Sequence, residues 1–204
     1  ALTKQPKKKI EKPELEDLLT SGFQTNYGGA FLLLPYLFIL EIDKLIHYLG
    51  VKKQDGISTL QSVLTLIFLA VIGKKRVSKG ETIKDYGIAA IAGFSKMPSK
   101  SYLHNFLDQI TVSCAENFQI ASAKAFKTLG IFKSEIINLD GHFIGYFGKS
   151  RIGKDKHPTR NISMRGIKAF FCQDQETGNP VIARVAYPRK GLTPENVTIP
   201  MLEI

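Results

Sequence analysis

The chain has 204 residues, of which 44% are hydrophobic and 23% are charged, so it can bury a core in one or two domains. Its formal net charge of +10 favours a polyanionic partner, either a nucleic acid or an anionic membrane surface. The two cysteines, Cys114 and Cys172, stand far apart in the sequence. This spacing argues against a zinc site and against a disulfide framework, and it indicates a reducing, cytoplasmic setting.

Two apolar stretches, residues 30–40 and 63–73, are candidates for membrane-spanning helices by composition. Both fall short of the roughly 20 apolar residues that a spanning helix needs, and Pro35 interrupts the first. We therefore expect buried helices and no membrane partner. Where one chain does not cover these helices completely, we expect them to form a homo-oligomer interface.

The first 130 residues predict a basic leader and then a helical domain. Residues 1–25 form the expected leader, with a short helix over residues 14–19, and the helical domain spans residues 26–130. Its helices are expected in the apolar segment that ends at Gly50, from the N-cap Ser58 to Ile72, and over residues 82–92, 100–114 and 115–129.

Residues 82–114 also admit a helix-turn-helix for DNA binding, with polar side chains at the front of its second helix. Those side chains would be Lys100, Ser101, His104 and Asn105. Two packed helices around a turn with Gly and Pro are equally typical of any helical domain.

The pattern changes from helices to strands at Ile131. Residues 136–140 form a short apolar run that ends on the carboxylate of Asp140. A polar, basic loop follows over residues 145–165. Two further strands are expected over residues 167–174 and 181–187, joined by a turn-rich connection of the hairpin type. We expect Asp140 at the end of a central strand that these two strands flank.

The last residues predict the beginning of a helix at Thr193-Pro194-Glu195, where a capping hydroxyl precedes a proline and an acid. We expect the natural reading frame to continue past Ile204, to complete this helix and to enter a strand that ends on a second Asp.

In this order, the residues resemble prokaryotic insertion-sequence transposases of the DDE class. The resemblance covers about residues 26–204. In the second half it rests on Leu139-Asp140-Gly141-His142, Arg160, Arg165-Gly166, Phe170-Phe171-Cys172-Gln173-Asp174 and Pro180-Val181-Ile182-Ala183. In the helical half it rests on Asp85-Tyr86-Gly87-Ile88-Ala89, Ala92-Gly93-Phe94, Met97-Pro98-Ser99 and Tyr102-Leu103.

The resemblance implies the fold and the reaction. The fold would be an α-helical N-terminal domain for DNA binding and self-association, followed by the first strands of an incomplete RNase H-like α/β domain over residues 131–204. The reaction would be DNA transposition, in which a phosphodiester is hydrolysed and the freed 3′ hydroxyl attacks target DNA. The implied partners are transposon ends, target DNA and further copies of the chain.

The resemblance also implies that Asp140 is the first catalytic carboxylate and a metal ligand. Phosphodiester cleavage of this kind uses two ions about 3.5–4 Å apart, and Mg²⁺ (or Mn²⁺) prefers oxygen ligands from several elements. Asp140 alone cannot hold such a pair, so residues outside this chain would complete the site. His142, two residues further along the strand, is a possible accessory residue, although a satisfied neighbour of a core strand is the commoner role for such a histidine.

Cations gather in the sequence after Asp140, where they are expected to contact DNA phosphates without reading bases. They are Lys149, Arg151, Lys154, Lys156, Arg160, Arg165 and Lys168. Two acids nearby are expected to have structural roles: Asp174 caps the hairpin connection, and Asp155 balances local charge.

Two other functions remain open at this point. One is a non-catalytic DNA-binding or regulatory remnant of a transposase. The other is an RNase H-like nuclease that cuts without strand transfer.

Overall fold

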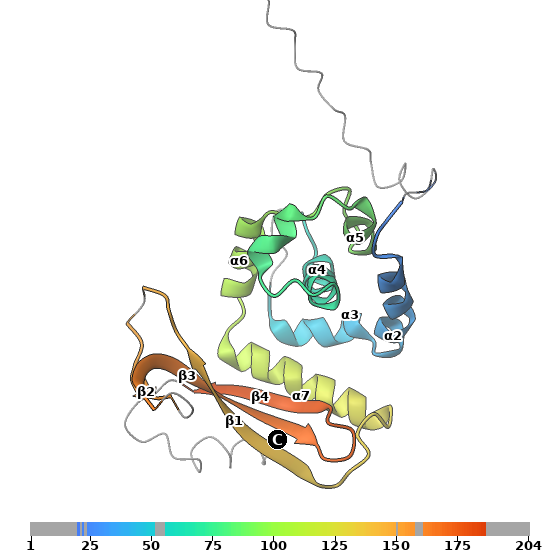
Figure 1. The fold of residues 1–204 in the computed structure, drawn as a ribbon. Coiled ribbons are helices and arrows are strands. Elements are labelled where there is room, and N and C mark those ends of the chain that lie inside the picture. Colours follow the sequence, from blue (N-terminus) through green and yellow to red (C-terminus); the bar gives the residue numbers. More distant parts are fainter. Residues whose placement is uncertain are drawn as a thin grey trace, which may run out of the picture. The chain divides into compact units, whose positions relative to one another are not determined.

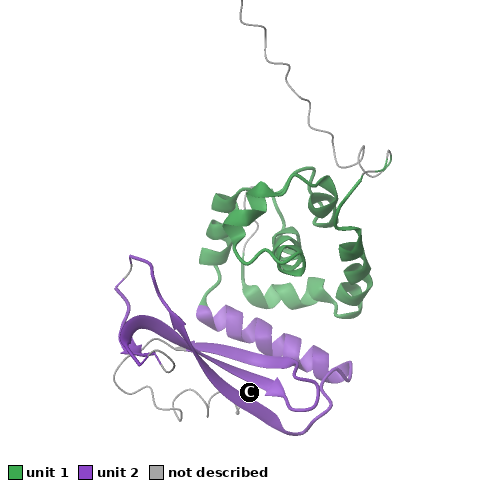
Figure 2. Ribbon diagram, viewed as in Figure 1, with its two compact units in different colours: residues 1–111 green, residues 112–204 purple. Residues whose placement is uncertain are grey.

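The computed structural model describes Thr20, Gly22 and residues 24–51, 56–149, 151–157 and 161–186. The chain divides into two compact units, residues 1–111 (unit 1) and residues 112–204 (unit 2) (Figure 2). The expected helix over residues 14–19 and the expected helix start at Thr193 lie outside the described residues. No helix among the described residues is both long and apolar enough to cross a membrane.

Unit 1 is built from helices, as the sequence predicts, but they are shorter and more numerous. Where one apolar helix is expected to end at Gly50, four short segments follow one another, and the positive φ of Glu41, 49°, breaks the helical path between the second and the third. The helices of unit 1 are η1 (Gly28–Leu33), α2 (Leu34–Ile39), α3 (Ile42–Leu45), η2 (Ile46–Leu49), α4 (Thr59–Val71), η3 (Val77–Thr82), α5 (Tyr86–Ile91) and α6 (Lys100–Asp108) (Figure 1).

The ends of α4 confirm their sequence signals. Ser58 accepts a hydrogen bond from the Gln61 backbone N–H, while the Gln61 side chain accepts one from the Ser58 backbone N–H, so the two residues form a capping box. At the other end Gly73 adopts a φ of 75°, a conformation that favours glycine and stops the helix.

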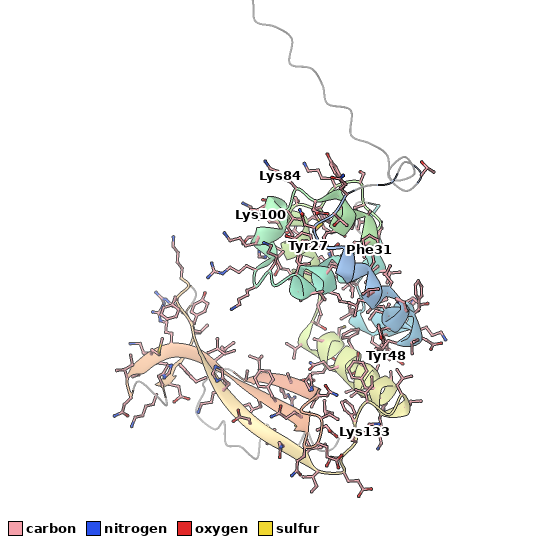
Figure 3. The ribbon with its side chains drawn as sticks, turned by 45° about the vertical axis from the view of Figure 1, so that its right-hand side comes forward. Tyr27, Phe31, Tyr48, Lys84, Lys100 and Lys133 are labelled. Atoms are coloured by element: carbon pink, nitrogen blue, oxygen red, sulfur yellow. The ribbon has the colours of Figure 1, made fainter. Side chains whose placement is uncertain are left out.

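The core of unit 1 forms where α4 meets α5 and α6. Phe68, Ile88 and Leu103 have relative exposures of at most 1% and contribute the centre of this cluster. Tyr27 and Phe31, both labelled in Figure 3, pack against it from the segment around η1. Asp85 holds this segment in place by accepting hydrogen bonds from the Thr25 hydroxyl and the Asn26 backbone N–H.

The helix-turn-helix that residues 82–114 could form stays a prediction, and its two helices are joined differently from those of the usual motif. Asp85 caps α5, which begins at Tyr86 rather than near Thr82, and α6 ends at Asp108. Residues 92–99 connect the two helices, a longer connection than the three or four residues of that motif. Lys100, Ser101, His104 and Asn105 do lie on α6.

Unit 2 combines one long described helix, α7 (Val112–Thr128), with an antiparallel sheet of four strands: β1 (Ile137–Gly145), β2 (Lys154–Lys156), β3 (Ser163–Asp174) and β4 (Pro180–Ala186). The sequence places a domain boundary after residue 130, but α7 groups with the sheet. It runs along the sheet beside β4 (Figure 1). Gly130, with a φ of 67°, ends the helix where the sequence predicts.

The expected strand arrangement is wrong in two respects: β1 is not the central strand, and Asp140 does not lie at its end. Strand β3 is central: Cys172 pairs with Leu139 of β1 on one edge and with Ile182 of β4 on the other. Strand β1, which carries Asp140, pairs with β3 alone among the described strands. It also continues five residues past Asp140 to Gly145, so Asp140 lies within the strand and not at its end.

Helix α7 packs against one face of the sheet, which we call the helix face. Ile120 of α7 contacts the cluster around Cys172 and Ile182. Glu116 pairs with Arg184 of β4 at 2.9 Å, and the Gln119 side chain accepts a hydrogen bond from the Ala183 backbone N–H at 2.8 Å. The helix therefore covers the β4 side of this face, and Gln119 also accepts a hydrogen bond from an amide of β4 that does not bond to β3.

Candidate functional site

The face opposite to the helix face, which we call the open face, carries Asp140. Side chains alternate between the two faces of a strand, and β1 pairs with β3 from Ile137 to Gly145 without a shift in register. Leu139 and its partner Cys172 belong to the helix face, so Asp140 and its partner Phe171 belong to the open face. Asp140 and Phe171 are both exposed.

The carboxylate of Asp140 is available for a ligand. Its Oδ1 accepts a hydrogen bond of 2.8 Å from the backbone N–H of Gly141, and no described cation forms an ion pair with it. His142 is also exposed and lies on the same face, two residues along β1. Two residues of a strand span about 6.6 Å, so one ligand on the open face can contact both side chains.

The pleat divides the predicted DNA-binding cations between the two faces. Arg165 lies six residues from Phe171 on β3, so it shares the open face with Asp140. Lys154 pairs with Arg165, and Lys156 pairs with Ser163, so both lysines of β2 also lie on the open face. At about 3.3 Å per residue, Arg165 and Lys154 lie roughly 20 Å along β3 from Asp140, and Lys156 lies roughly 26 Å from it.

Lys168 lies on the helix face instead, because it is an even number of residues from Cys172. There its ammonium group pairs with the carboxylate of Asp155 at 2.7 Å. The hydrogen bond from Lys168, together with one from the Lys156 backbone N–H, lowers the pKa of Asp155. Asp155 therefore balances local charge, as expected, and its partner Lys168 does not share the open face with Arg165, Lys154 and Lys156.

The remaining predicted cations are Lys149, Arg151 and Arg160. Lys149 and Arg151 are exposed in the connection between β1 and β2. Arg160 lies outside the described residues. The sequence pattern predicts that all seven cations belong to one loop. Arg165 and Lys168 are three residues apart, and in a strand this odd spacing places their side chains on opposite faces.

Asp174, at the end of β3, has the structural role that the sequence predicts. Its Oδ1 accepts hydrogen bonds from the backbone N–H and the hydroxyl of Thr177, and its Oδ2 accepts from the backbone N–H groups of Lys133 and Ser134. Burial raises its pKa, but these hydrogen bonds outweigh that effect and lower the pKa to about 2. The carboxylate thus joins the β3–β4 connection to the segment before β1.

Asp140 fits a divalent cation as one ligand of a larger set. A carboxylate is the oxygen donor that Mg²⁺ and Mn²⁺ prefer, and Asp140 is exposed on the open face. Within the described ranges, no group of three His, Cys, Asp or Glu side chains could hold a metal ion. The described part of the site therefore supplies one carboxylate and a neighbouring imidazole.

Comparisons with known proteins do not add to this description: no protein-family model, curated protein or solved structure matches the chain.

Proposed function

We propose that this chain is part of a DNA transposase of the DDE class, that unit 2 begins its RNase H-like catalytic domain, and that Asp140 is its first catalytic carboxylate. One observation supports the proposal most strongly. The open face of the sheet carries an exposed Asp140 free of any ion pair with a described residue, and three cations lie further along the same face. A site that cuts a phosphodiester needs both features.

The cations of the open face bind DNA in this proposal. Lys154, Lys156 and Arg165 contact backbone phosphates and orient the duplex along β3 without choosing a sequence. The distance of Lys154 and Arg165 from Asp140, roughly 20 Å, corresponds to about six phosphates on one strand, since these are about 3.4 Å apart along the helix axis. DNA held by the cations can therefore extend over the carboxylate.

Asp140 supplies an oxygen ligand to Mg²⁺ or Mn²⁺, and further carboxylates have to complete a two-ion site. When bound, the two ions would activate the attacking oxygen and stabilise the leaving oxygen. His142 would contact the phosphate beside the scissile bond from its position on the same face.

Self-association belongs to the same proposal. Unit 1 exposes large apolar side chains on η1 and α2, including Phe38 with a relative exposure of 77% and Leu32 with 74%. Exposed apolar patches commonly mark interfaces, and the occupant that we propose is a second copy of the chain.

The experiment that tests the catalytic role is Asp140→Asn in the full reading frame. Asparagine keeps the shape of the side chain but removes its charge. We expect metal-dependent cleavage of a transposon-end duplex to fall by at least about 100-fold, and DNA binding measured in EDTA to stay unchanged. Cleavage at the wild-type rate would exclude Asp140 as a catalytic residue.

The alternative is a non-catalytic DNA-binding remnant, which the open-face cations support equally. It predicts salt-dependent DNA binding and no metal-dependent cleavage by either the wild type or the Asp140→Asn variant. Binding of Mn²⁺ separates the two functions as well: the transposase requires that Asp140→Asn weaken it, whereas the remnant does not.

A further inference from the structure

A second basic surface lies in unit 1, where α4 meets η3. Four cations and no apolar side chain line a shallow pocket of about 470 Å³. The lining residues are Gly73, Lys74, Lys75, Arg76, Lys79 and Thr82. In the sequence, Lys74, Lys75 and Arg76 directly follow Gly73, close to the end of α4 where a helix dipole favours cations.

The backbone around this pocket is held in place by local hydrogen bonds. After α4, the N–H of Gly73 donates to the Ala70 carbonyl at 2.9 Å and the N–H of Lys74 donates to the Leu69 carbonyl at 2.8 Å. This pattern fixes the direction in which the chain leaves the helix. In η3 the Thr82 hydroxyl donates to the Lys79 carbonyl at 2.7 Å.

Packing holds η3 against α4. A Cβ on Gly80 would lie 3.4 Å from Leu69 Cδ1, so the backbone of η3 rests directly on a buried side chain of α4. The four cations of the pocket therefore project from a backbone that is held in place by packing and hydrogen bonds. A preformed pocket of this kind loses less conformational entropy on ligand binding than a flexible loop does.

Glu81, which lies in η3, does not neutralise the cations of the pocket. Glu81 directs its carboxylate toward α6, where Oε1 accepts a 2.7 Å hydrogen bond from the Lys100 backbone N–H and Oε2 lies 4.0 Å from Lys100 Nζ. Within the described ranges, no ion pair includes the four cations of the pocket. No described acid therefore compensates their charge.

The position of the cations shows that helix stabilisation explains only part of this charge. A cation beside the last turn of a helix is stabilised by the helix dipole, but this effect fades within about one turn. Lys74 and Lys75 lie close to the end of α4 and Lys79 lies in the last turn of η3, whereas Arg76 precedes the first turn of η3 and gains nothing from either dipole.

We propose that this pocket binds the phosphodiester backbone of duplex DNA as a contact separate from the open face of the sheet. The inference shares DNA as partner with the proposed function but does not depend on catalysis by Asp140. The lining has cations for phosphates and no apolar side chain on which a base or a lipid chain could rest. A shallow site with this lining fits a run of phosphates better than a single nucleotide or a membrane surface.

The test replaces all four cations by glutamine: Lys74, Lys75, Arg76 and Lys79. A matched control variant replaces four exposed lysines outside the pocket, namely Lys44, Lys96, Lys124 and Lys127. Both variants lose the same charge. Affinity for a labelled duplex is measured in EDTA over a series of salt concentrations, and a melting curve confirms that each variant is folded.

We expect the pocket variant to flatten the slope of log affinity against log salt by up to about 3.6, since each neutralised phosphate contributes about 0.9. The control variant should change the slope by less than about 1. A variant with arginine at positions 74, 75 and 79 keeps the charge and should bind like the wild type. This variant also tests the inference if the glutamine variant does not fold. If the folded arginine variant lost DNA binding, the pocket would not bind the phosphate backbone through its charge.

Two results would overturn the inference: a pocket variant with the slope of the control variant, or a pocket variant that loses binding to phosphatidylserine vesicles but not to DNA. Asp140→Asn distinguishes this failure from failure of the proposed function. If Asp140→Asn abolishes cleavage while the pocket variant binds DNA normally, the transposase proposal stands and the pocket inference fails. If the pocket variant loses binding while Asp140→Asn has no effect on cleavage, the reverse holds.

Discussion

Asp140 and Asp174 are both acids on paired strands, yet their surroundings give them opposite properties. Asp174 has a relative exposure of 1% and accepts four hydrogen bonds. Asp140 is exposed and accepts one bond from its own neighbour, Gly141. A buried, satisfied carboxylate holds structure together, whereas an exposed carboxylate with free lone pairs can take a ligand.

Asp174→Asn should destabilise unit 2 in a pH-dependent way. The folded-state pKa of Asp174, about 2, lies below the value of about 3.9 expected in the unfolded chain. The contribution of the carboxylate to stability is therefore fully present above pH of about 4, and it is lost as the pH falls through about 2. We expect the variant to melt several degrees below the wild type at pH 7, with the gap closing toward pH 2.

Thermal melts followed by circular dichroism between pH 2 and pH 7 measure this gap. Asp140→Asn is the matched control, because Asp140 makes only a local hydrogen bond and should melt like the wild type at every pH. A constant gap between Asp174→Asn and the wild type across this range would contradict the role given to the Asp174 charge.

At the scale of the elements, Gly166 shows how closely β1 and β3 approach each other. Phe143 of β1 is buried, with a relative exposure of 6%, and its ring lies across Gly166, where an added Cβ would collide with it. Overpacking of this kind typically costs about 1–3 kcal/mol. We expect Gly166→Ala to lower the free energy of unfolding of unit 2 by that amount in urea denaturation.

Gly29→Ala serves as the control, since a Cβ on Gly29 meets no atom within 4 Å and its φ is not positive. It should leave the stability unchanged or raise it slightly, because alanine has fewer conformations to lose on folding. Equal effects of the two substitutions would mean that the Phe143 ring moves away from position 166 without cost.

Local signals in the sequence predict both ends of α4 and the end of α7, but not the start of α5 or the end of α6. Ser58 and Gly73 bound α4, and Gly130 ends α7, because each acts through hydrogen bonds or dihedral angles within a few residues. The faces of the sheet also follow from residue parity once the register is known.

The extent and order of the strands could not be read from the sequence. The apolar run before Asp140 stops there, yet β1 continues to Gly145 because it pairs with β3, whose residues lie more than 20 positions away. The central place of β3 depends on the same distant pairing. Likewise, Gly80 of η3 packs on Leu69 of α4, a contact that no local pattern reveals.

At the scale of the whole molecule, the two sheet faces predict different effects on DNA binding. Replacing Lys154, Lys156 and Arg165 by glutamine should flatten the salt dependence of binding by up to about 2.7, at about 0.9 for each phosphate. Lys168→Gln should leave it nearly unchanged, because Lys168 lies on the helix face and pairs with Asp155. Fluorescence anisotropy over a salt series measures both, and a larger effect of Lys168→Gln would contradict the assignment of faces.

Self-association is the second property of the whole molecule that can be tested. Phe38→Ser and Leu32→Ser each remove an exposed apolar side chain from unit 1 and should leave its core intact. If a second copy covers this patch, the double variant should have the mass of a single chain in light scattering where the wild type has a higher mass. Equal masses for the two would contradict the proposed interface.

The pleat of β1 has a consequence for which mutations the gene can tolerate. Deleting one codon between residue 137 and residue 145 moves the residues on one side of the deletion by one place along β3. The moved residues turn to the opposite face of the sheet, so the apolar side chains of β1 and the polar ones exchange faces over that part of the strand. A scan of single-codon deletions along β1 should therefore lower the melting temperature of unit 2 at every position, whereas conservative substitutions in the same strand should lower it much less.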